Sequence, residues 1–323
     1  MDSGIGAFDK AAWLAAFAAA CLAAPSFSAE AEGAQEGASP VHDGTAAQAD
    51  ESAPESAATE SAADATAAFA TSVAGDSACR AAGDRLVIEI AGIEVPVRWC
   101  PPGSFEMGSP DDEIGRYSDE TMHKVTFTKG FWIGETEVTQ ELWVQIMGTN
   151  PSFRKSGSRY PVENVSWDEY HAFLAKLNAR APEGWSFALP TEAQWEYACR
   201  AGSTDPYAGS GLLDDMGWYT SNSGGRTHPV AQKSPNDWGL YDMHGNVLEW
   251  CEDRYGSYPE EDVVDQAGVA TGESRVLRGG SSWRDARFCR SAFRFWNSPS
   301  RRFRLSGIRL VATRAGGAPE PAP

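Results

Sequence analysis

The chain has 323 residues, of which 42% are hydrophobic, 11% aromatic and 22% charged. This composition is typical of a globular protein and excludes a fibrous or wholly disordered chain. The 27 basic and 45 acidic side chains give a formal net charge of −18, which argues against a general nucleic-acid binder, because such proteins need positive charge to neutralise phosphates.

Residues 1–24 predict export. Lys10 is followed by an apolar run of 14 residues, AAWLAAFAAACLAA, which has the length of a signal-peptide core and is short for a membrane span. Two kinds of processing remain open. Ala29 offers a small residue for simple cleavage, although Phe27 fits poorly before it, whereas residues 18–21 form a degenerate lipobox that would leave a lipidated Cys21 at the mature N-terminus. We expect a cell-surface lipoprotein or a periplasmic or secreted protein, with membrane contact only through that anchor.

Residues 25–78 predict a disordered acidic linker. No Lys or Arg occurs from residue 11 to residue 79, whereas residues 22–79 carry ten carboxylates. Such a segment has few large apolar side chains to bury, so it cannot offset the entropy of ordering its backbone. Residues 79–314 hold 11 of the 12 tryptophans and are long enough for one well-buried domain, followed by a flexible tail over 315–323.

Cysteine and histidine spacing gives no zinc or non-haem iron motif, since neither a CxxC pair nor a His/Cys cluster is present. In an exported chain some of the cysteines should form disulfides. The sequence leaves open whether Cys79, Cys100 and Cys251 pair or stay free.

The segment 85–99 alternates apolar and polar residues on either side of Ala91-Gly92, which predicts a hairpin. A second β-rich stretch covers 124–139. Helices are predicted to begin at Thr139 and at Thr191, each with its hydroxyl as N-cap, and another helix is predicted to follow residues 166–169 because Tyr170, Phe173, Leu174 and Leu177 have helical spacing. From residue 205 onward Gly, Asn, Ser and Pro interrupt every pattern, so we expect little regular structure there.

Seven motifs follow one another in this chain: MGSPDDE (107–113), ETEVTQELW (135–143), PVENVSWDEY (161–170), LPTEAQWEYACR (189–200), GGRTHPV (224–230), GLYDMHGNVLEW (239–250) and RVLRGGSSW (275–283). Together they resemble the sulfatase-modifying-factor or formylglycine-generating-enzyme family, from about residue 101 to residue 314. The resemblance implies an α+β domain with a C-type-lectin-like formylglycine-generating-enzyme fold and low regular secondary structure. Fold alone does not establish function.

The resemblance also bears on catalysis. Active members use two cysteines shortly after the Gly-Gly-Ser turn, which bind copper as thiolates, but residues 282–286 contain no cysteine. Cys289 matches the family's structural cysteine, whose partner would be Cys199. A Cys199–Cys289 disulfide would contribute roughly 2–4 kcal/mol to stability and would leave no thiolate pair for copper. We therefore expect no copper and favour a non-catalytic protein, with a formylglycine-generating-type oxidase or maturation enzyme for exported proteins as the alternative.

A structural calcium site is implied at the family's GNxWEW motif. The matching positions are Asp242 and Glu249 by side chain, with Gly245 and Val247 by backbone carbonyl. Two carboxylates with carbonyl oxygens suit a hard cation such as Ca²⁺. The alternative is that both carboxylates only hydrogen-bond the turn.

Residues 281–309 carry eight arginines and one acid, a local charge of +7 in an acidic chain. Some positions match the family scaffold and are called the frame here: 286–287, 289–292, Arg294, Pro299, Arg302 and 307–309. The side chains between them resemble the variable region of diversity-generating-retroelement target proteins. The candidate ligand-binding positions are Trp283, Arg284, Asp285, Phe288, Phe293, Phe295, Trp296, Asn297, Phe303, Arg304 and Leu305. Most of these residue types can arise from an Asn codon by changes in its first two bases, although the two tryptophans cannot.

Clustered Arg and aromatic side chains are typical of binding hot spots. We expect them to bind an unidentified protein or glycan ligand, presented on a scaffold stiffened by calcium or a disulfide. The competing interpretation is structural: the aromatic rings pack inward and the arginines cover them. It predicts that Phe293, Phe295, Trp296 and Phe303 are buried.

Overall fold

The computed structural model describes residues 80–315. The predicted leader (1–24), the lipidation site Cys21, the acidic linker (25–78), Cys79 and nearly all of the tail (315–323) lie outside the described residues. Within the described residues, no helix is long and apolar enough to cross a membrane.

The largest sheet has five strands in the order β1 (Arg85–Ile90), β2 (Ile93–Cys100), β5 (Phe131–Gly134), β12 (Val311–Arg314) and β6 (Trp185–Ala188). All of its neighbouring strands are antiparallel. The predicted β1–β2 hairpin is confirmed, and it turns at Ala91 and Gly92, whose φ angles are 52° and 82°. Because β12 lies between β5 and β6, the end of the domain closes the sheet begun by its first strands.

Two smaller sheets complete the β-structure. One has the order β10 (Phe295–Asn297), β9 (Arg275–Arg278), β7 (Leu248–Arg254) and β11 (Ser306–Gly307), and in it β11 runs parallel to β7. The other contains β3 (Gly103–Met107), β4 (His123–Phe127) and β8 (Val263–Val264). The C-terminal Arg-rich segment thus supplies β10 and β11 to the four-stranded sheet, and β12, which follows the segment, belongs to the five-stranded one.

All three predicted helices are confirmed, as are the two predicted N-caps, Thr139 and Thr191. Thr139 accepts a hydrogen bond from the backbone of α2 (Gln140–Met147), and full capping boxes begin α3 (Trp167–Asn178) and α4 (Glu192–Arg200). Such caps occupy backbone N–H groups that have no partner within the helix. Between α4 and β7 the only helix or strand is α5 (Leu213–Met216), which agrees with the low regular structure expected there.

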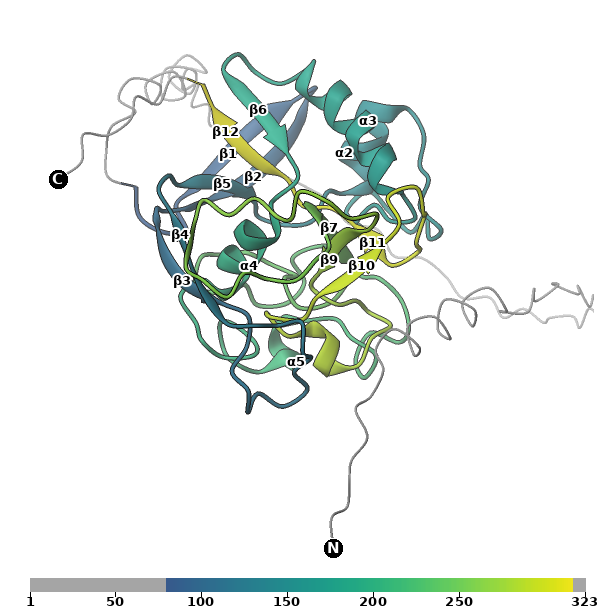
Figure 1. The fold of residues 1–323 in the computed structure, drawn as a ribbon. Coiled ribbons are helices and arrows are strands. Elements are labelled where there is room, and N and C mark those ends of the chain that lie inside the picture. The colour runs from purple at the N-terminus through teal and green to yellow at the C-terminus, as the bar shows by residue number, and fades with distance from the viewer. Residues whose placement is uncertain (1–79, 316–323) are drawn as a thin grey trace, which may run out of the picture. The chain divides into compact units, whose positions relative to one another are not determined.

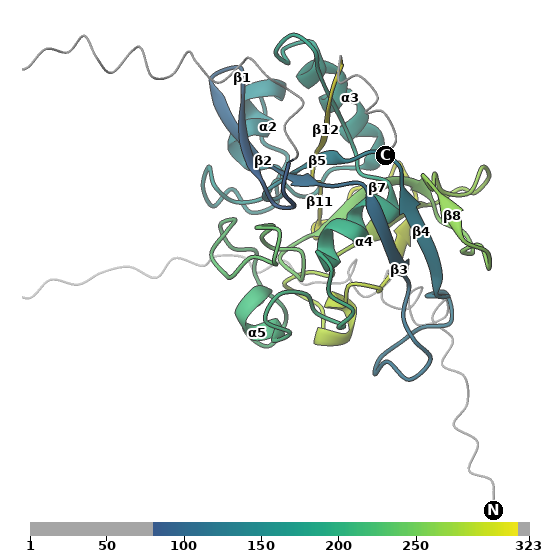
Figure 2. The same ribbon diagram turned by 90° about the vertical axis from the view of Figure 1, so that its left-hand side faces the viewer.

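Figures 1 and 2 show how these elements are arranged: α2, α3 and the five-stranded sheet occupy one end of the domain and α5 the other, with α4 between them. Helix α4 is buried along its whole length. Its Trp195 and Tyr197 pack in a core with Phe127, Phe131 and Leu240. The predicted α+β architecture with few regular elements is therefore confirmed.

Candidate ligand-binding face

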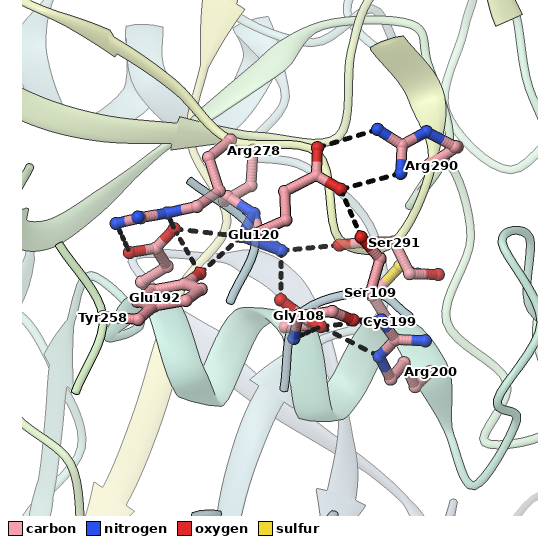
Figure 3. A network of polar contacts seen from close by, with 12 residues as sticks. Gly108, Ser109, Glu120, Glu192, Cys199, Arg200, Tyr258, Arg278, Arg290 and Ser291 are labelled. Atoms are coloured by element: carbon pink, nitrogen blue, oxygen red, sulfur yellow. Dashed lines mark hydrogen bonds and ion pairs between the residues drawn. The ribbon is translucent and has the colours of Figure 1, made fainter. Parts of the chain in front are cut away.

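Buried arginines in and directly before the C-terminal segment anchor it to α4. Arg278 of β9, just before the segment, donates to Glu192 Oε1 at 3.0 Å (Figure 3) and to Glu196 Oε2 at 2.5 Å. Arg294 binds the same Glu192 with two hydrogen bonds, at 2.7 and 2.8 Å. Burial alone would raise the pKa of Glu192, but Arg294 and Arg278 hold it below its usual value. Glu192 is therefore ionised at neutral pH and joins α4 to β9 and to the C-terminal segment.

Two more frame arginines are fully buried and paired. Arg290 donates to both oxygens of Glu120, at 2.8 and 2.7 Å, and also contacts Glu113. Arg309 binds Glu249 at 2.7 Å. Such paired, hydrogen-bonded charges hold one geometry, and losing one partner is costly.

The Gly-Gly turn before the segment is a steric requirement. Gly279 and Gly280 have φ angles of 92° and 73°, which other residues rarely adopt. A Cβ at Gly280 would also lie 2.6 Å from Cys289 Sγ. The turn therefore brings the start of the segment against its 3₁₀ helix, η1 (Ala286–Cys289).

The structure divides the eleven candidate binding residues into two groups. Six are exposed or half-buried: Trp283, Asp285, Trp296, Asn297, Phe303 and Arg304. Five are buried: Arg284, Phe288, Phe293, Phe295 and Leu305. The structural interpretation therefore holds for Phe293 and Phe295, whereas Trp296 and Phe303 remain partly accessible.

The buried members pack against one another. Phe288 and Phe293 meet edge to face with centroids 5.1 Å apart. The Arg284 guanidinium lies 5.3 Å from the Phe288 ring centroid and 5.2 Å from that of Phe295. These side chains therefore belong to the packed interior, and the accessible members of the predicted set are the other six.

The accessible residues lie on two stretches of the segment. One stretch lies just before η1 and holds Trp283, which is 55% exposed, and Asp285. The backbone there contacts residues 220–223: Thr220 N donates to Arg284 O at 3.0 Å, and Ser223 Oγ donates to Ser282 O. The other four residues belong to β10, an edge strand, and to the loop that follows it.

Sequence reasoning missed a neighbouring loop. Phe153 is 57% exposed, and the Arg304 guanidinium lies 3.8 Å from its ring centroid. The run FRKSGSR (153–159), with three basic residues and no acid, was a signal in the sequence, but nothing local connects it to the C-terminal segment.

The predicted Cys199–Cys289 disulfide is not formed in this structure, where both are free, buried thiols. The His244 imidazole contacts both residues: its Nε2 lies 3.8 Å from Cys199 Sγ, and its Nδ1 lies 2.8 Å from Cys289 O. Burial raises the pKa of each thiol to about 12. Cys100 and Cys251 are also buried and free. Protonated, enclosed thiols do not suit a centre that requires two accessible thiolates.

The residues implied for calcium fit a cation unevenly. Both oxygens of Glu249 are engaged, by Arg309 and by Trp195 Nε1 at 2.7 Å. Asp242 Oδ2 accepts a hydrogen bond from Ala231 N. The other Asp242 oxygen, Oδ1, and Glu137 Oε2 are both buried and receive no hydrogen bond from an N–H or O–H donor among the described residues. Burial raises the pKa of Asp242 to about 6, and burial and Asp242 together raise that of Glu137. Across residues 80–315, no group of three or more His, Cys, Asp or Glu side chains has a metal-binding arrangement.

Comparison with known proteins agrees with this architecture. The chaperone protein LppX of Paenibacillus barcinonensis is 32% identical over 243 residues, covering 58% of this chain and 80% of that protein. The formylglycine-generating enzyme of Streptomyces coelicolor is 35% identical over 185 residues, covering 49% of this chain and 56% of the enzyme. Among solved structures, Treponema denticola variable protein 1 is 33% identical, with a TM-score of 0.65, and the match covers 71% of this chain and 99% of that one.

Against the formylglycine-generating enzyme the chain spans little more than half of the relative's length, so that relative's activity does not transfer by similarity. Residues 96–314 match the family described as the Sulfatase-modifying factor enzyme 1-like domain. The chain therefore belongs to the sulfatase-modifying factor enzyme 1-like domain family.

Proposed function

We propose that this protein binds a protein or glycan ligand through the accessible residues of its C-terminal segment, from Trp283 to Arg304. The observation that carries this proposal is the alternation along the segment: ion-paired frame arginines are buried, and accessible side chains stand between them. A face built in this way can change its contact residues while its frame keeps the fold. The similarity to a protein named a variable protein supports the same interpretation.

We further propose that the chain is exported and held at a membrane by lipidated Cys21. The leader pattern supports this proposal. Mass spectrometry of the protein from its native host would show a diacylated N-terminal cysteine. An unmodified N-terminus created by cleavage after Ala29 would contradict the anchor but not export.

The alternative, a formylglycine-generating-type oxidase, would need a reactive thiol pair near residues 283–289. Only Cys289 is present there, and it is buried. Conversion of a cysteine-containing sulfatase peptide to formylglycine by the purified protein would establish this alternative and overturn a purely binding role.

The test of the binding proposal uses a library randomised at Trp283, Asp285, Trp296 and Asn297, displayed and selected on a panel of unrelated proteins and glycans. Binders to several targets with unchanged folding are expected. A library of the same size at Glu89, Glu94, Glu106 and Lys129, exposed residues outside the C-terminal segment, should yield none. If both libraries yielded binders equally often, the C-terminal segment would have no special role in binding.

A genetic test is independent of any ligand. Sequencing the flanking DNA should reveal a reverse transcriptase and a near-copy of the codons for residues 281–309 that differs only at adenines. Absence of both would limit the proposal to a fixed binding face.

Calcium is proposed at the site that the resemblance implies, Asp242 and Glu249 with the carbonyls of Gly245 and Val247. Glu137, whose carboxyl group lies beside that of Asp242, would be a further ligand. A bound cation would stabilise the fold by mass action. Calcium should raise the melting temperature above that in EDTA, and Asp242→Asn should abolish the difference. Identical melting in both buffers would exclude the ion.

A further inference from the structure

Two loops far apart in sequence, both rich in basic side chains, meet at the exposed ring of Phe153. We define the basic surface by Phe153, Arg154, Lys155, Arg159, Arg301 and Arg304. All of them are exposed except Arg301, which is half-buried. The first four come from the loop between α2 and α3, and the last two follow β10.

Specific contacts hold the two loops together. Asn164 N donates to Phe303 O at 3.2 Å, which ties the chain before α3 to the C-terminal loop. Arg154 N donates to the buried carboxylate of Glu163 at 2.9 Å, which fixes the backbone beside Phe153. The Arg304 guanidinium then lies 3.8 Å from the centre of the Phe153 ring. The basic surface is thus a defined arrangement and does not depend on side chains meeting by chance.

The positive charge of this surface is only partly neutralised within the described part of the chain. Arg302, next to it, pairs with Glu169, and the charges of Arg154 and Arg304 act on the buried carboxylate of Glu163. The acids of the neighbouring segments are Glu163, which is enclosed beneath the loop, Asp168 at the start of α3, and Glu141 of α2, whose N–H donates to Ser158 O at 3.1 Å. In a chain of net charge −18, basic side chains on two loops that meet at an exposed ring favour a negatively charged partner.

The chemistry of the side chains narrows the partner. Arginine presents a planar fork that binds carboxylates through two parallel hydrogen bonds. An exposed phenyl ring gains most when it buries an apolar side chain against it. We propose that the basic surface binds a carboxylate-rich peptide segment of a partner protein that carries an apolar side chain at the Phe153 ring. This proposal rests on the proposed binding function and names a partner class for the part of the face around Arg304.

The experiment uses two labelled peptides of equal length and charge, one repeating Glu-Glu-Leu and the other Glu-Glu-Gly, measured by fluorescence anisotropy. The full chain should bind the Leu peptide more tightly than the Gly peptide. Arg154→Glu combined with Arg304→Glu should weaken binding of both by about tenfold or more, since each exposed ion pair contributes up to about 1 kcal/mol and the variant also adds repulsion. Phe153→Ala should remove only the preference for the Leu peptide.

A charge-matched control is Lys124→Glu with Lys129→Glu, two exposed residues on or beside β4 that lie outside the basic surface. It should bind both peptides like the unchanged protein, and circular dichroism and melting should show that every variant folds.

Equal loss in this control would mean that net charge alone drives binding and would overturn the proposal. Binding of heparin without binding of either peptide would overturn it in favour of a sulfated glycan. Binders from the display library with no peptide binding would reject the partner class while leaving the proposed function standing.

Discussion

At the scale of single residues, charge pairs in the interior determine which parts of the C-terminal segment can vary. Glu120 and Arg290 are both fully buried and bind each other through two hydrogen bonds. By contrast, Trp283 is exposed in the same segment. Substitutions at Arg290 and at Trp283 should therefore lower the free energy of unfolding by very different amounts.

Arg290→Met should lower the free energy of unfolding by about 3–5 kcal/mol, because it leaves Glu120 and Glu113 buried without their cation. Urea denaturation would measure the loss. Arg287→Met, a neighbouring exposed arginine, serves as the control and should change stability by no more than about 0.5 kcal/mol. Comparable effects of the two variants would contradict the anchoring role of Arg290.

Glu163 should make stability depend on pH. Burial raises its pKa from 4.5 to about 7, so the folded state binds a proton more tightly than the unfolded state does. The protonated Glu163 side chain stabilises the fold fully below pH 4.5, the pKa of the unfolded state. This stabilisation is lost as the pH rises through 7, so the free energy of unfolding should fall by about 2–3 kcal/mol. The difference in unfolding free energy between the wild type and Glu163→Gln should shrink or reverse by this amount over that range. A difference independent of pH would mean that Glu163 has an ordinary pKa.

At the scale of elements, short strands and one 3₁₀ helix organise the segment around buried rings. Phe288 in η1 and Phe293 after it pack together, whereas Trp283 and Asp285 lie before η1 on the surface. The sequence shows the same kinds of residue in both places, so their different burial is a property of the fold.

Phe293→Ala should therefore lower the free energy of unfolding by about 3–5 kcal/mol, since it removes a large aromatic side chain from a packed interior. Trp283→Ala should change the free energy of unfolding by no more than about 0.5 kcal/mol. Chemical denaturation of both variants would show whether the accessible positions tolerate substitution. A Trp283→Ala protein as unstable as Phe293→Ala would mean that this residue is structural.

At the scale of the whole molecule, long-range contacts join regions that carry no local sign of one another. Cys199 in α4 and Cys289 in η1 both lie against His244, which belongs to the turn before β7. Three distant stretches of chain therefore meet at one buried position. The thiols at that position are free.

Alkylation of the unfolded, unreduced protein followed by mass spectrometry should consequently find Cys199 and Cys289 modified as separate thiols. Prior reduction should not alter this result, because there is no bond to break. A peptide joined through Cys199 and Cys289 would contradict the free thiols and support the pairing that the family resemblance implies.

The sequence alone determined the features that arise from neighbouring residues. The hairpin at Ala91-Gly92 and the helix starts at Thr139, Ser166 and Thr191 were predictable, because turns and caps depend on hydrogen bonds between residues only a few positions apart. The order of motifs likewise determined the family. Strands of two to four residues, such as β8 and β11, were not predictable, since they are too short to show a period.

Only the tertiary structure decided which members of the Arg and aromatic segment are accessible, and that Phe153 lies beside Arg304. The Arg290–Glu120 pair spans 170 residues and the Arg304–Phe153 contact spans a similar part of the chain. Burial at such positions depends on which distant segment covers them, and an alternation of Arg and Phe fits an inward or an outward orientation equally well. The physical reason is that packing of remote parts of the chain, and not local preference, places these side chains.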